Sequence, residues 1–488
     1  MSPEKTIRPK ARLPRGFRDR EAGEIAAERR LIEIIRGVYE SYGFAPLETP
    51  AFEYTDALGK FLPDVDRPNE GVFSLKDDDE QWLSLRYDLT APLARYVAEN
   101  FQTLPKPFRR YQVGPVWRNE KPGPGRYREF TQFDADTVGS NSSAADAELL
   151  MMVCDALQAL GLSTSDFKVG FNNRKLLDAV LQAIQASPKL RGTILRALDK
   201  RDRLGVSGVA ALLGKGRKDE SGDFTAGANL ETWQIDCLLQ FSDPEADKTS
   251  LTQLGVALER RGTLTELWNV ALNELILIGD LITDCGYDPN QSLIEMDTSI
   301  IRGLDYYTGP VFEAQLTFPV TNEAGETVVF GSVAGGGRYD DLVARFTGQQ
   351  VPATGMSIGV SRLLAAMQQR GLTGDEKSLI VVLSMGDAAA SFAIARELRA
   401  AGFRAEAYVG TKKFGDQLKY ADKRGATLVV MEGDDERAKG EVTIKDLKLG
   451  AEISKSVESR AEWVGIRAAQ TTVKRDGLVA QVRAMLGR

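Results

Sequence analysis

The polar residues of one segment are spaced as if they share a face of an extended chain. In residues 109–139, RRYQVGPVWRNEKPGPGRYREFTQFDADTVG, two strand-like pieces flank a loop of proline and glycine. Side chains at even intervals point to the same side of a pleated strand. The residues at such intervals are Arg118, Glu120, Arg126, Arg128, Gln132 and Asp136. Arginines that face a pocket suit a planar, bidentate grip on a phosphate. The alternative is a solvated hairpin with ordinary charge pairing.

A second cluster lies at residues 301–309, IRGLDYYTG. Arg302, Asp305, Tyr306 and Tyr307 bring a permanent cation, an acceptor and two phenols into a few positions. This combination suits recognition of a polar ring next to a phosphate. The alternative is a joint between a strand and a turn, with the tyrosines packed on the core.

A third segment, SLRYDLTAP at residues 84–92, carries Arg86, Asp88 and Thr90 at alternate positions. On one strand, the three side chains would share a face. The alternation alone is a weak signal for function.

Two glycine-containing segments complete the set, AGGGRYDD at residues 334–341 and GMSIGVSR at residues 355–362. Consecutive glycines allow a ligand to approach the backbone closely. Neither segment fits the P-loop pattern or the dinucleotide fingerprint. By itself, such a run more often marks a bulge or a tight turn.

Composition excludes several kinds of chemistry. The chain has 488 residues, enough for about three domains of ~150 residues. It contains no histidine, which excludes every Ser-His, Cys-His and His-metal mechanism. Cys154, Cys237 and Cys285 form no C-x-x-C pair, so we expect neither a zinc site nor disulfides, but buried thiols in a reducing compartment.

The net charge of −7 means that any nucleic-acid site must be a local basic patch. No stretch approaches the ~20 apolar residues of a membrane span, and the N-terminus lacks the apolar core of a signal peptide. A cytoplasmic protein without membrane contact is therefore expected.

The elements that must position these residues follow from periodicity. A helix is predicted over 21–42, and closely spaced strands up to residue 138 favour an antiparallel sheet. Leu- and Ala-rich helical periodicity then fills the chain to about residue 289, after which strands return. Beyond a polar linker, strands and helices alternate. The predicted divisions are a catalytic core in two parts, 1–173 and 291–370, a helical insertion at 174–290, and an α/β domain with a C-terminal extension at 378–488.

In this order, the segments resemble the class II aminoacyl-tRNA synthetases over nearly the whole chain. Residues 43–52 look like the first class motif, which builds the dimer interface in that family. Residues 117–130 look like the second motif, and residues 355–363 like the third. LRYDLT, QFDAD and RGLDYY specifically resemble the histidyl-tRNA synthetases. The resemblance implies an α+β fold: an antiparallel sheet with flanking helices, a helical insertion and a C-terminal α/β anticodon-binding domain.

The resemblance also implies a site for ATP with Mg²⁺. Arg118 would grip the α-phosphate, Arg362 would contact the γ-phosphate, and Arg302 would stand where charge develops on the α-phosphate. Glu120 and Arg126 would belong to the same site. Arg118 and Arg302 are thus the expected catalytic residues, and no resident metal site is expected.

The histidine site is implied in the same way. Asp88, Thr90 and Gln132 would surround the amino and carboxylate ends of the amino acid. Asp136 and Tyr307 would hydrogen-bond the two imidazole nitrogens, with Tyr306 beside them. Some members of the family have Glu where Asp88 and Asp136 stand, which shortens the reach of these carboxylates here.

The implied partner is tRNA(His). Lys121, in the loop after residue 120, would approach the acceptor end. The C-terminal domain resembles the anticodon-binding domain of several synthetases and carries Lys412, Lys413 and Lys419, which could form the local basic patch. An exposed charged helix face is the alternative for these lysines. The tail after Gly450 is expected to add a basic amphipathic helix.

The expected activity is ATP-dependent attachment of L-histidine to tRNA(His) through a histidyl-adenylate, by a homodimer. The alternative is a histidine-binding relative that acts as a regulatory subunit of ATP phosphoribosyltransferase. Such relatives generally lack the anticodon domain and drift in the ATP motifs. The retained Arg118, Arg302 and Arg362 therefore favour the enzyme.

Overall fold

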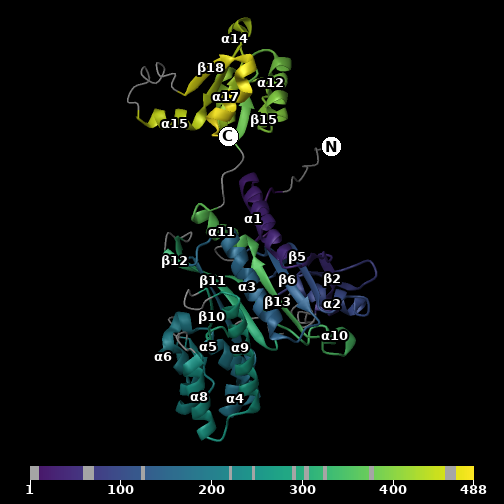
Figure 1. The fold of residues 1–488 in the computed structure, drawn as a ribbon, viewed down its shortest axis with the longest axis vertical. Coiled ribbons are helices and arrows are strands. Elements are labelled where there is room, and N and C mark those ends of the chain that lie inside the picture. The colour runs from purple at the N-terminus through teal and green to yellow at the C-terminus, as the bar shows by residue number, and fades with distance from the viewer. Residues whose placement is uncertain are drawn as a thin grey trace, which may run out of the picture. The chain divides into compact units, whose positions relative to one another are not determined.

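A computed structural model describes residues 10–58, 71–121, 127–218, 223–243, 248–287, 293–301, 307–321, 327–372, 378–456 and 469–487. The chain forms two compact units, residues 1–373 and residues 374–488. Figure 1 shows the helices and strands of both units.

The first unit is built on an eight-stranded sheet in the order β1-β5-β6-β13-β12-β11-β7-β10. Its strands are β1 (Ala45–Pro46), β5 (Phe108–Trp117), β6 (Glu129–Val138), β7 (Phe167–Asn173), β10 (Ile294–Met296), β11 (Pro310–Thr321), β12 (Thr327–Arg338) and β13 (Ala353–Gly359). The six strands from β5 to β7 run antiparallel to their neighbours, and only the short outer strands β1 and β10 pair in parallel. This confirms the predicted antiparallel sheet.

One face of the sheet is apolar because its strands alternate. Along β6, Phe133 and Ala135 are fully buried in the hydrophobic core. Three helices supply the other side of this core: α1 (Ala22–Ser41), α3 (Ser143–Ala159) and α11 (Val360–Gln369). Figure 1 shows them along one side of the sheet. Tyr39 of α1 meets Phe133 edge-to-face, with ring centroids 4.9 Å apart.

The chain between β1 and β5 forms a small sheet of order β2-β4-β3 and short helices. The later helix α10 contacts α2 of this group. These elements are β2 (Phe52–Tyr54), η1 (Thr55–Leu58), β3 (Ser74–Lys76), β4 (Trp82–Leu85), α2 (Thr90–Asn100) and, later in the chain, α10 (Ala344–Thr347). Tyr87 joins η1 to α2, since it packs with Leu58 and Ala91 in a separate cluster.

A helical segment separates β7 from β10. It contains α4 (Arg174–Ala183), η2 (Pro188–Leu190), α5 (Arg191–Leu198), α6 (Arg201–Leu213), β8 (Gly216–Lys218), β9 (Phe224–Ala226), α7 (Thr232–Phe241), α8 (Lys248–Arg260) and α9 (Glu266–Asp284). Figure 1 shows its helices gathered at one end of the sheet. Leu258 and Trp268 belong to the same buried cluster as the sheet's apolar face, so the segment shares one core with it.

The second unit has a five-stranded sheet in the order β15-β14-β16-β17-β18. Its elements are β14 (Leu379–Val382), α12 (Ala388–Ala400), β15 (Arg404–Ala407), α13 (Phe414–Lys423), β16 (Ala426–Met431), α14 (Asp434–Lys439), β17 (Glu441–Asp446), α15 (Leu447–Ser456), β18 (Gln470–Lys474), η4 (Arg475–Gly477) and α17 (Leu478–Met485). The tail after Gly450 does more than add a helix: it supplies an edge strand, and Leu478 and Val482 of α17 are fully buried in the core.

The cysteines fit the prediction only in part. Cys154 is buried, but Cys237 is half-buried and Cys285 is exposed. Cys285 is the C-cap residue of α9. It is exposed because the chain leaves the helix at the surface there, although its side chain is small and apolar.

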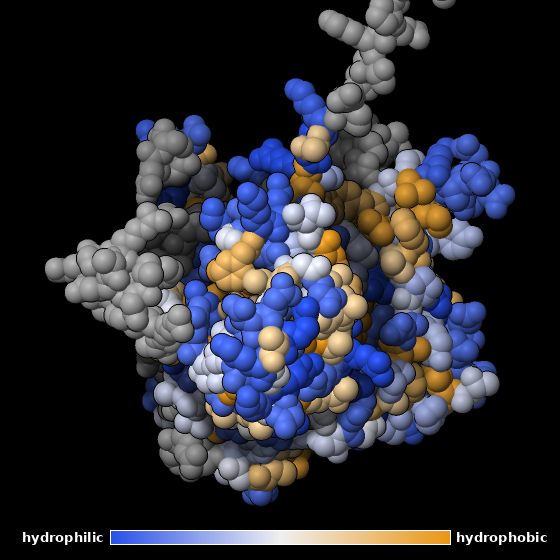
Figure 2. Space-filling view, turned by 90° about the horizontal axis from the view of Figure 1, so that it is seen from above, coloured by the Kyte–Doolittle hydropathy of each residue, from blue (hydrophilic) through white to orange (hydrophobic). Residues whose placement is uncertain are grey.

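The surface in Figure 2 is mainly hydrophilic, with hydrophobic residues in small patches. Among the described residues, no helix combines the length and the apolar character needed to span a bilayer.

Substitution of Gly336 in β12 tests how tightly the central strands are packed. A Cβ atom at Gly336 would lie 2.1 Å from the Gly355 carbonyl oxygen, and backbone atoms yield little. We therefore expect Gly336→Ala to lower the free energy of unfolding by roughly 1–3 kcal/mol or more, as measured by chemical denaturation. Gly37→Ala is the matched control, because nothing lies within 4 Å of that Cβ in α1. Alanine should stabilise that helix by up to about 1 kcal/mol, and equal effects at the two sites would contradict this packing.

Candidate active site

The face of the sheet opposite the hydrophobic core is polar and partly lined by glycine. Strand register sets its residues in three rows across neighbouring strands. The rows are Arg110, Asp136, Gly355 and Gly337; Gln112, Asp134, Ser357 and Gly335; and Gly114, Gln132 and Gly359. Because five of these positions lack a side chain, the sheet leaves room for a ligand close to its backbone.

Asp136 is the most strongly held residue of this face. Its Oδ2 atom lies 2.8 Å from Nη2 of the fully buried Arg110, and its Oδ1 atom accepts a hydrogen bond from the Tyr339 hydroxyl. Burial raises the pKa of Asp136, while Arg110 and Tyr339 act in the opposite direction. Gly355 is required beside it, since a Cβ there would come within 2.0 Å of Oδ1.

Asp134 lies between Gln132 and Asp136 and was not among the predicted site residues. Its side chain is buried, yet Oδ1 accepts no hydrogen bond from any described residue. The Thr90 hydroxyl donates to Oδ2 over a long 3.5 Å. Burial, followed by the neighbouring Asp136 carboxylate, raises the pKa of Asp134. The two-residue strand period could have identified this position from the sequence, because it falls on the face of its predicted neighbours.

Gln132 is also only partly satisfied. Its Nε2 atom donates to the Ser357 hydroxyl over 2.7 Å, whereas its buried Oε1 atom has no partner among the described residues. Unpaired buried acceptors are uncommon in folded proteins, so they commonly mark a place where a ligand donates.

The predicted strand face of Arg86, Asp88 and Thr90 is wrong. Strand β4 ends at Leu85, and Thr90 is the first residue of α2. Asp88 Oδ1 accepts from the backbone N–H of Ala91, which caps the new helix. The chain therefore turns after Leu85, and the three residues do not share a strand face.

Arg86 has a structural position. Its Nη1 atom donates to the Thr49 carbonyl over 2.7 Å, and its Nε atom donates to the Pro115 carbonyl over 3.0 Å. It thereby ties β5 to the segment that follows β1. Its Nη2 atom lies 2.5 Å from the Cβ position of Gly114, so Arg86 borders the polar face, where Asp88 and Thr90 lie near Asp134.

The phosphate-binding candidates depart from the predicted strand spacing. Strand β5 ends at Trp117, so Arg118 and Glu120 lie beyond it, and Arg126 lies outside the described residues. The Arg118 Nε atom donates to the Tyr87 carbonyl over 3.1 Å, and its guanidinium lies 5.0 Å from the ring centroid of Phe130. Glu120 and Lys121 are exposed.

Arg362 lies in the first turn of α11 and is exposed. Its Nη2 atom donates to the Phe330 carbonyl over 2.9 Å. Its neighbour Ser361 accepts a hydrogen bond from the backbone N–H of Thr131, over 3.0 Å. Since Thr131 follows Phe130, on which Arg118 lies, the structure brings the two predicted phosphate-binding arginines to the same end of β6.

Tyr307 reaches the polar face at its other end. It is half-buried and packs on a cluster around α2, and its ring lies 3.1 Å from the Cβ position of Gly337. Arg302 and Tyr306 lie outside the described residues.

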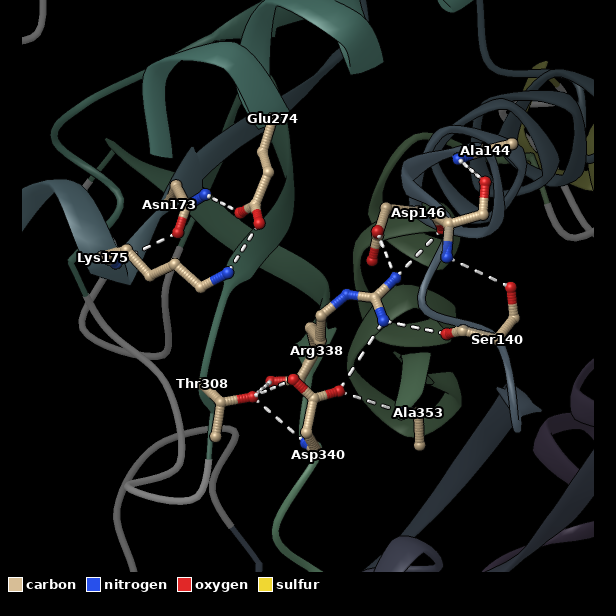
Figure 3. A network of polar contacts seen from close by, with 11 residues as sticks. Ser140, Ala144, Asp146, Asn173, Lys175, Glu274, Thr308, Arg338, Asp340 and Ala353 are labelled. Atoms are coloured by element: carbon tan, nitrogen blue, oxygen red, sulfur yellow. Dashed lines mark hydrogen bonds and ion pairs between the residues drawn. The ribbon is translucent and has the colours of Figure 1, made fainter. Parts of the chain in front are cut away.

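A buried polar network fixes the chain next to Tyr307, as Figure 3 shows. The backbone N–H of Thr308 donates to the Arg338 carbonyl over 2.8 Å, and the Thr308 hydroxyl donates to Oδ2 of Asp340 over 3.0 Å. Arg338 in turn forms a buried ion pair with Asp146 of α3, with 2.5 Å between Nη2 and Oδ2. This network anchors the start of β11 to α3.

The lysines predicted to bind RNA lie in the second unit. Lys412 and Lys413 precede α13, Lys419 lies within it, and all three are exposed. The Lys419 Nζ atom is 3.8 Å from Asp416 Oδ1, a distance that leaves the ammonium largely available. Arg424, at the end of the same helix, is instead paired with Glu406.

An antiparallel sheet with flanking helices, a helical insertion and a C-terminal α/β unit is the architecture implied by the resemblance to class II aminoacyl-tRNA synthetases. Residues 16–363 match the family model described as histidyl-tRNA synthetase, and residues 377–465 match the model described as anticodon binding domain. The chain belongs to the histidyl-tRNA synthetase family.

Curated relatives agree over almost the full length. The chain is 55% identical to a histidine--tRNA ligase of Rhizobium rhizogenes, covering 98% of this chain and 96% of that protein. It is 54% identical to a histidine--tRNA ligase of Rhizobium meliloti, covering 99% and 97%. A crystal structure of histidyl-tRNA synthetase from Nostoc sp. PCC 7120 superposes with a TM-score of 0.72 at 28% identity, covering 98% of this chain and 100% of that one.

The buried and incompletely paired carboxylate of Asp134 predicts a stability that depends on pH. A carboxyl group whose pKa is raised by folding binds its proton more tightly when folded, so its stabilising effect is lost as the pH rises above the ordinary value of 3.8. Asp134→Asn removes this loss. We expect the variant to gain on the order of 1 kcal/mol or more over the parent at pH 7.5, with a smaller difference at pH 4, as measured by urea unfolding.

Asp166→Asn is the control with the opposite sign. Hydrogen bonds from Ser163 lower the pKa of Asp166, so its carboxylate stabilises the fold above pH 3.8. That variant should be less stable than the parent at pH 7.5. A loss of stability in both variants at pH 7.5 would show that Asp134 is satisfied in the folded chain.

Proposed function

We propose that this protein attaches L-histidine to tRNA(His) in two steps, with histidyl-adenylate as the intermediate. The observation that carries the proposal is a set of three buried polar side chains along β6, Gln132, Asp134 and Asp136. They lie beside glycines of the neighbouring strand, on the face opposite the hydrophobic core. A chain of this family with unpaired acceptors on such a face is suited to a small ligand that is rich in N–H groups.

The amino acid is recognised through its polar groups. Asp136 and Tyr307 bind the two imidazole nitrogens, with Tyr306 beside them, and Asp88, Thr90 and Gln132 bind the amino and carboxylate ends. A non-polar analogue would leave these buried groups unpaired, which gives discrimination on the order of 10⁴ without editing.

Activation is an in-line displacement at the α-phosphorus of ATP. A carboxylate oxygen of histidine forms the new bond to phosphorus as the bond to pyrophosphate breaks. Arg118 and Arg302 stabilise negative charge on the phosphoryl oxygens, and Arg362 holds the γ-phosphate. Glu120 and Arg126 complete the ATP site.

Mg²⁺ would neutralise phosphate charge when it is bound. Among the described residues, no group of three or more acidic or thiol side chains could hold a metal ion. Mg²⁺ usually binds through phosphate oxygens and water with one or two carboxylates. The site therefore fits an ion that enters together with ATP.

In the second step, a terminal ribose hydroxyl of tRNA attacks the activated carbonyl, and AMP leaves. A phosphate oxygen of the adenylate is the proposed proton acceptor, because the chain has no histidine to act as base. Lys121 lies towards the acceptor end of the tRNA, and the second unit binds the anticodon through Lys412, Lys413 and Lys419.

We further propose that the enzyme is a cytoplasmic homodimer. The small sheet that follows the first class motif exposes large apolar side chains on all three strands: Phe52, Tyr54, Leu75 and Trp82. An exposed apolar patch of this kind is typical of an interface. A second copy of the chain is its proposed partner.

A structural neighbour bears on the alternative function, a regulatory subunit of ATP phosphoribosyltransferase. A structure from Bacillus halodurans described as an ATP phosphoribosyltransferase regulatory subunit/histidyl-tRNA synthetase superposes with a TM-score of 0.64, covering 85% of this chain and 97% of that one. At 22% identity, this likeness concerns the fold alone. The second unit and the retained arginines favour the ligase.

The first step is tested by ATP–pyrophosphate exchange with each amino acid in turn. We expect exchange with histidine alone, and a loss of roughly 100-fold or more in kcat for Arg118→Ala and for Arg302→Ala. Arg370→Ala is the matched control, because this arginine pairs with Asp166 away from the polar face. Exchange that persists at the parental rate in either phosphate-site variant would exclude the assigned roles.

If the second unit binds tRNA, variants in it should affect the transfer of histidine to tRNA but not the formation of histidyl-adenylate. Replacing Lys412, Lys413 and Lys419 by Ala should raise the KM for tRNA by roughly 10-fold and weaken its salt dependence, because fewer phosphate charges are neutralised. ATP–pyrophosphate exchange should stay unchanged. The control replaces Lys439, Lys448 and Lys474, which are equally exposed in the same unit and change the net charge by the same amount. If the control raises KM equally, net charge rather than a local patch governs binding.

A further inference from the structure

We propose that Asp134 is a further substrate-binding residue, which accepts a hydrogen bond from the α-ammonium group of histidine. The inference rests on the proposed function and adds a residue that the family resemblance does not supply. Its basis is a buried carboxylate that the protein leaves incompletely paired, on the same strand face as the residues assigned to histidine.

The direction of the Asp134 side chain follows from the strand. Its neighbours Phe133 and Ala135 enter the hydrophobic core, so Asp134 must point to the opposite face. There it is 2% exposed, close to Ser357 of β13 and Thr90 of α2. The Thr90 hydroxyl donates to it over a long 3.5 Å, and Ser357 is a second hydrogen-bonding neighbour.

The charge of the site favours a cationic ligand. Asp88, Asp134 and Asp136 bring three carboxylates to this face, and the cations near them are Arg86 and Arg110. The guanidinium of Arg86 is committed to backbone carbonyls, and Arg110 lies against Asp136. Among the described residues, three carboxylates thus share two nearby guanidinium groups, and an ammonium group would supply the third positive charge.

The position of Asp134 along β6 indicates that it contacts the ammonium group of histidine rather than the imidazole ring. Asp134 and Asp136 are two residues apart, which spans roughly 6.6 Å on a strand. This is comparable to the length of a histidine molecule from its α-nitrogen to its far ring nitrogen. Asp136 faces Tyr339 and the Tyr307 end of the site, whereas Asp134 lies nearest Thr90, at the end assigned to the amino group.

Two fragments of the substrate separate the contacts. L-Histidinol keeps the ammonium group and the imidazole but has no carboxylate, and imidazolepropionate keeps the imidazole and the carboxylate but has no ammonium. Their dissociation constants are measured by calorimetry on the full chain without ATP. For Asp134→Asn, we expect histidinol to bind roughly 10- to 100-fold more weakly. Imidazolepropionate should change by less than about 3-fold, since it lacks the group that pairs with this charge.

The comparison is protected against effects on folding. Both compounds are measured on the same variant, so a smaller folded fraction reduces both signals equally. Asp134→Ala provides a second variant with the same expected difference between the compounds. Asp166→Asn makes the same chemical change away from the polar face and should leave both dissociation constants at parental values.

The outcomes distinguish this inference from the proposed function. Equal weakening of both compounds, or no weakening of either, overturns the ammonium contact while the histidine site of the parent chain stands. A parent chain that binds neither compound and shows no histidine-dependent pyrophosphate exchange overturns the proposed function together with the inference.

Discussion

The alternation of side chains along β6 is the constraint on which the site depends. Phe133 and Ala135 are held in the hydrophobic core by α1 and α3, and this fixes which way their neighbours point. Gln132, Asp134 and Asp136 have no other direction available, because a slip of one residue would bury the carboxylates in the core. The core thus supplies the force that keeps three polar groups on the opposite face of the sheet.

This arrangement has an energetic cost that a binding site can use. Buried carboxylates beside one another disfavour the charged form, and Arg110 offsets this for Asp136 more than for Asp134. A purely structural face would have apolar residues or complete hydrogen bonding at these positions. Incomplete pairing becomes favourable interaction energy when a ligand with N–H donors binds, which is how such sites reject non-polar analogues.

The glycines of β12 and β13 act together with the buried charges. Gly355 makes space for the Asp136 carboxylate, and Gly337 for the Tyr307 ring. Side chains at these two positions would occupy the space that the carboxylate and the ring now take. The polar network around Arg338 then holds β11 and β12 to α3, so that Thr308 joins the sheet at a fixed point next to Tyr307.

The sequence by itself determined the main sheet, the helical segment within it, the second α/β unit and the family, because hydrophobic periodicity and motif order are local properties of the chain. It also placed Gln132 and Asp136 on one strand face, where the two-residue period holds. Tertiary structure alone decided that Thr90 begins a helix capped by Asp88, so that Arg86, Asp88 and Thr90 do not share a strand face. It alone decided that Asp134 is buried without a full set of partners. Charge pairing depends on contacts between residues far apart in the chain, and no local pattern records it.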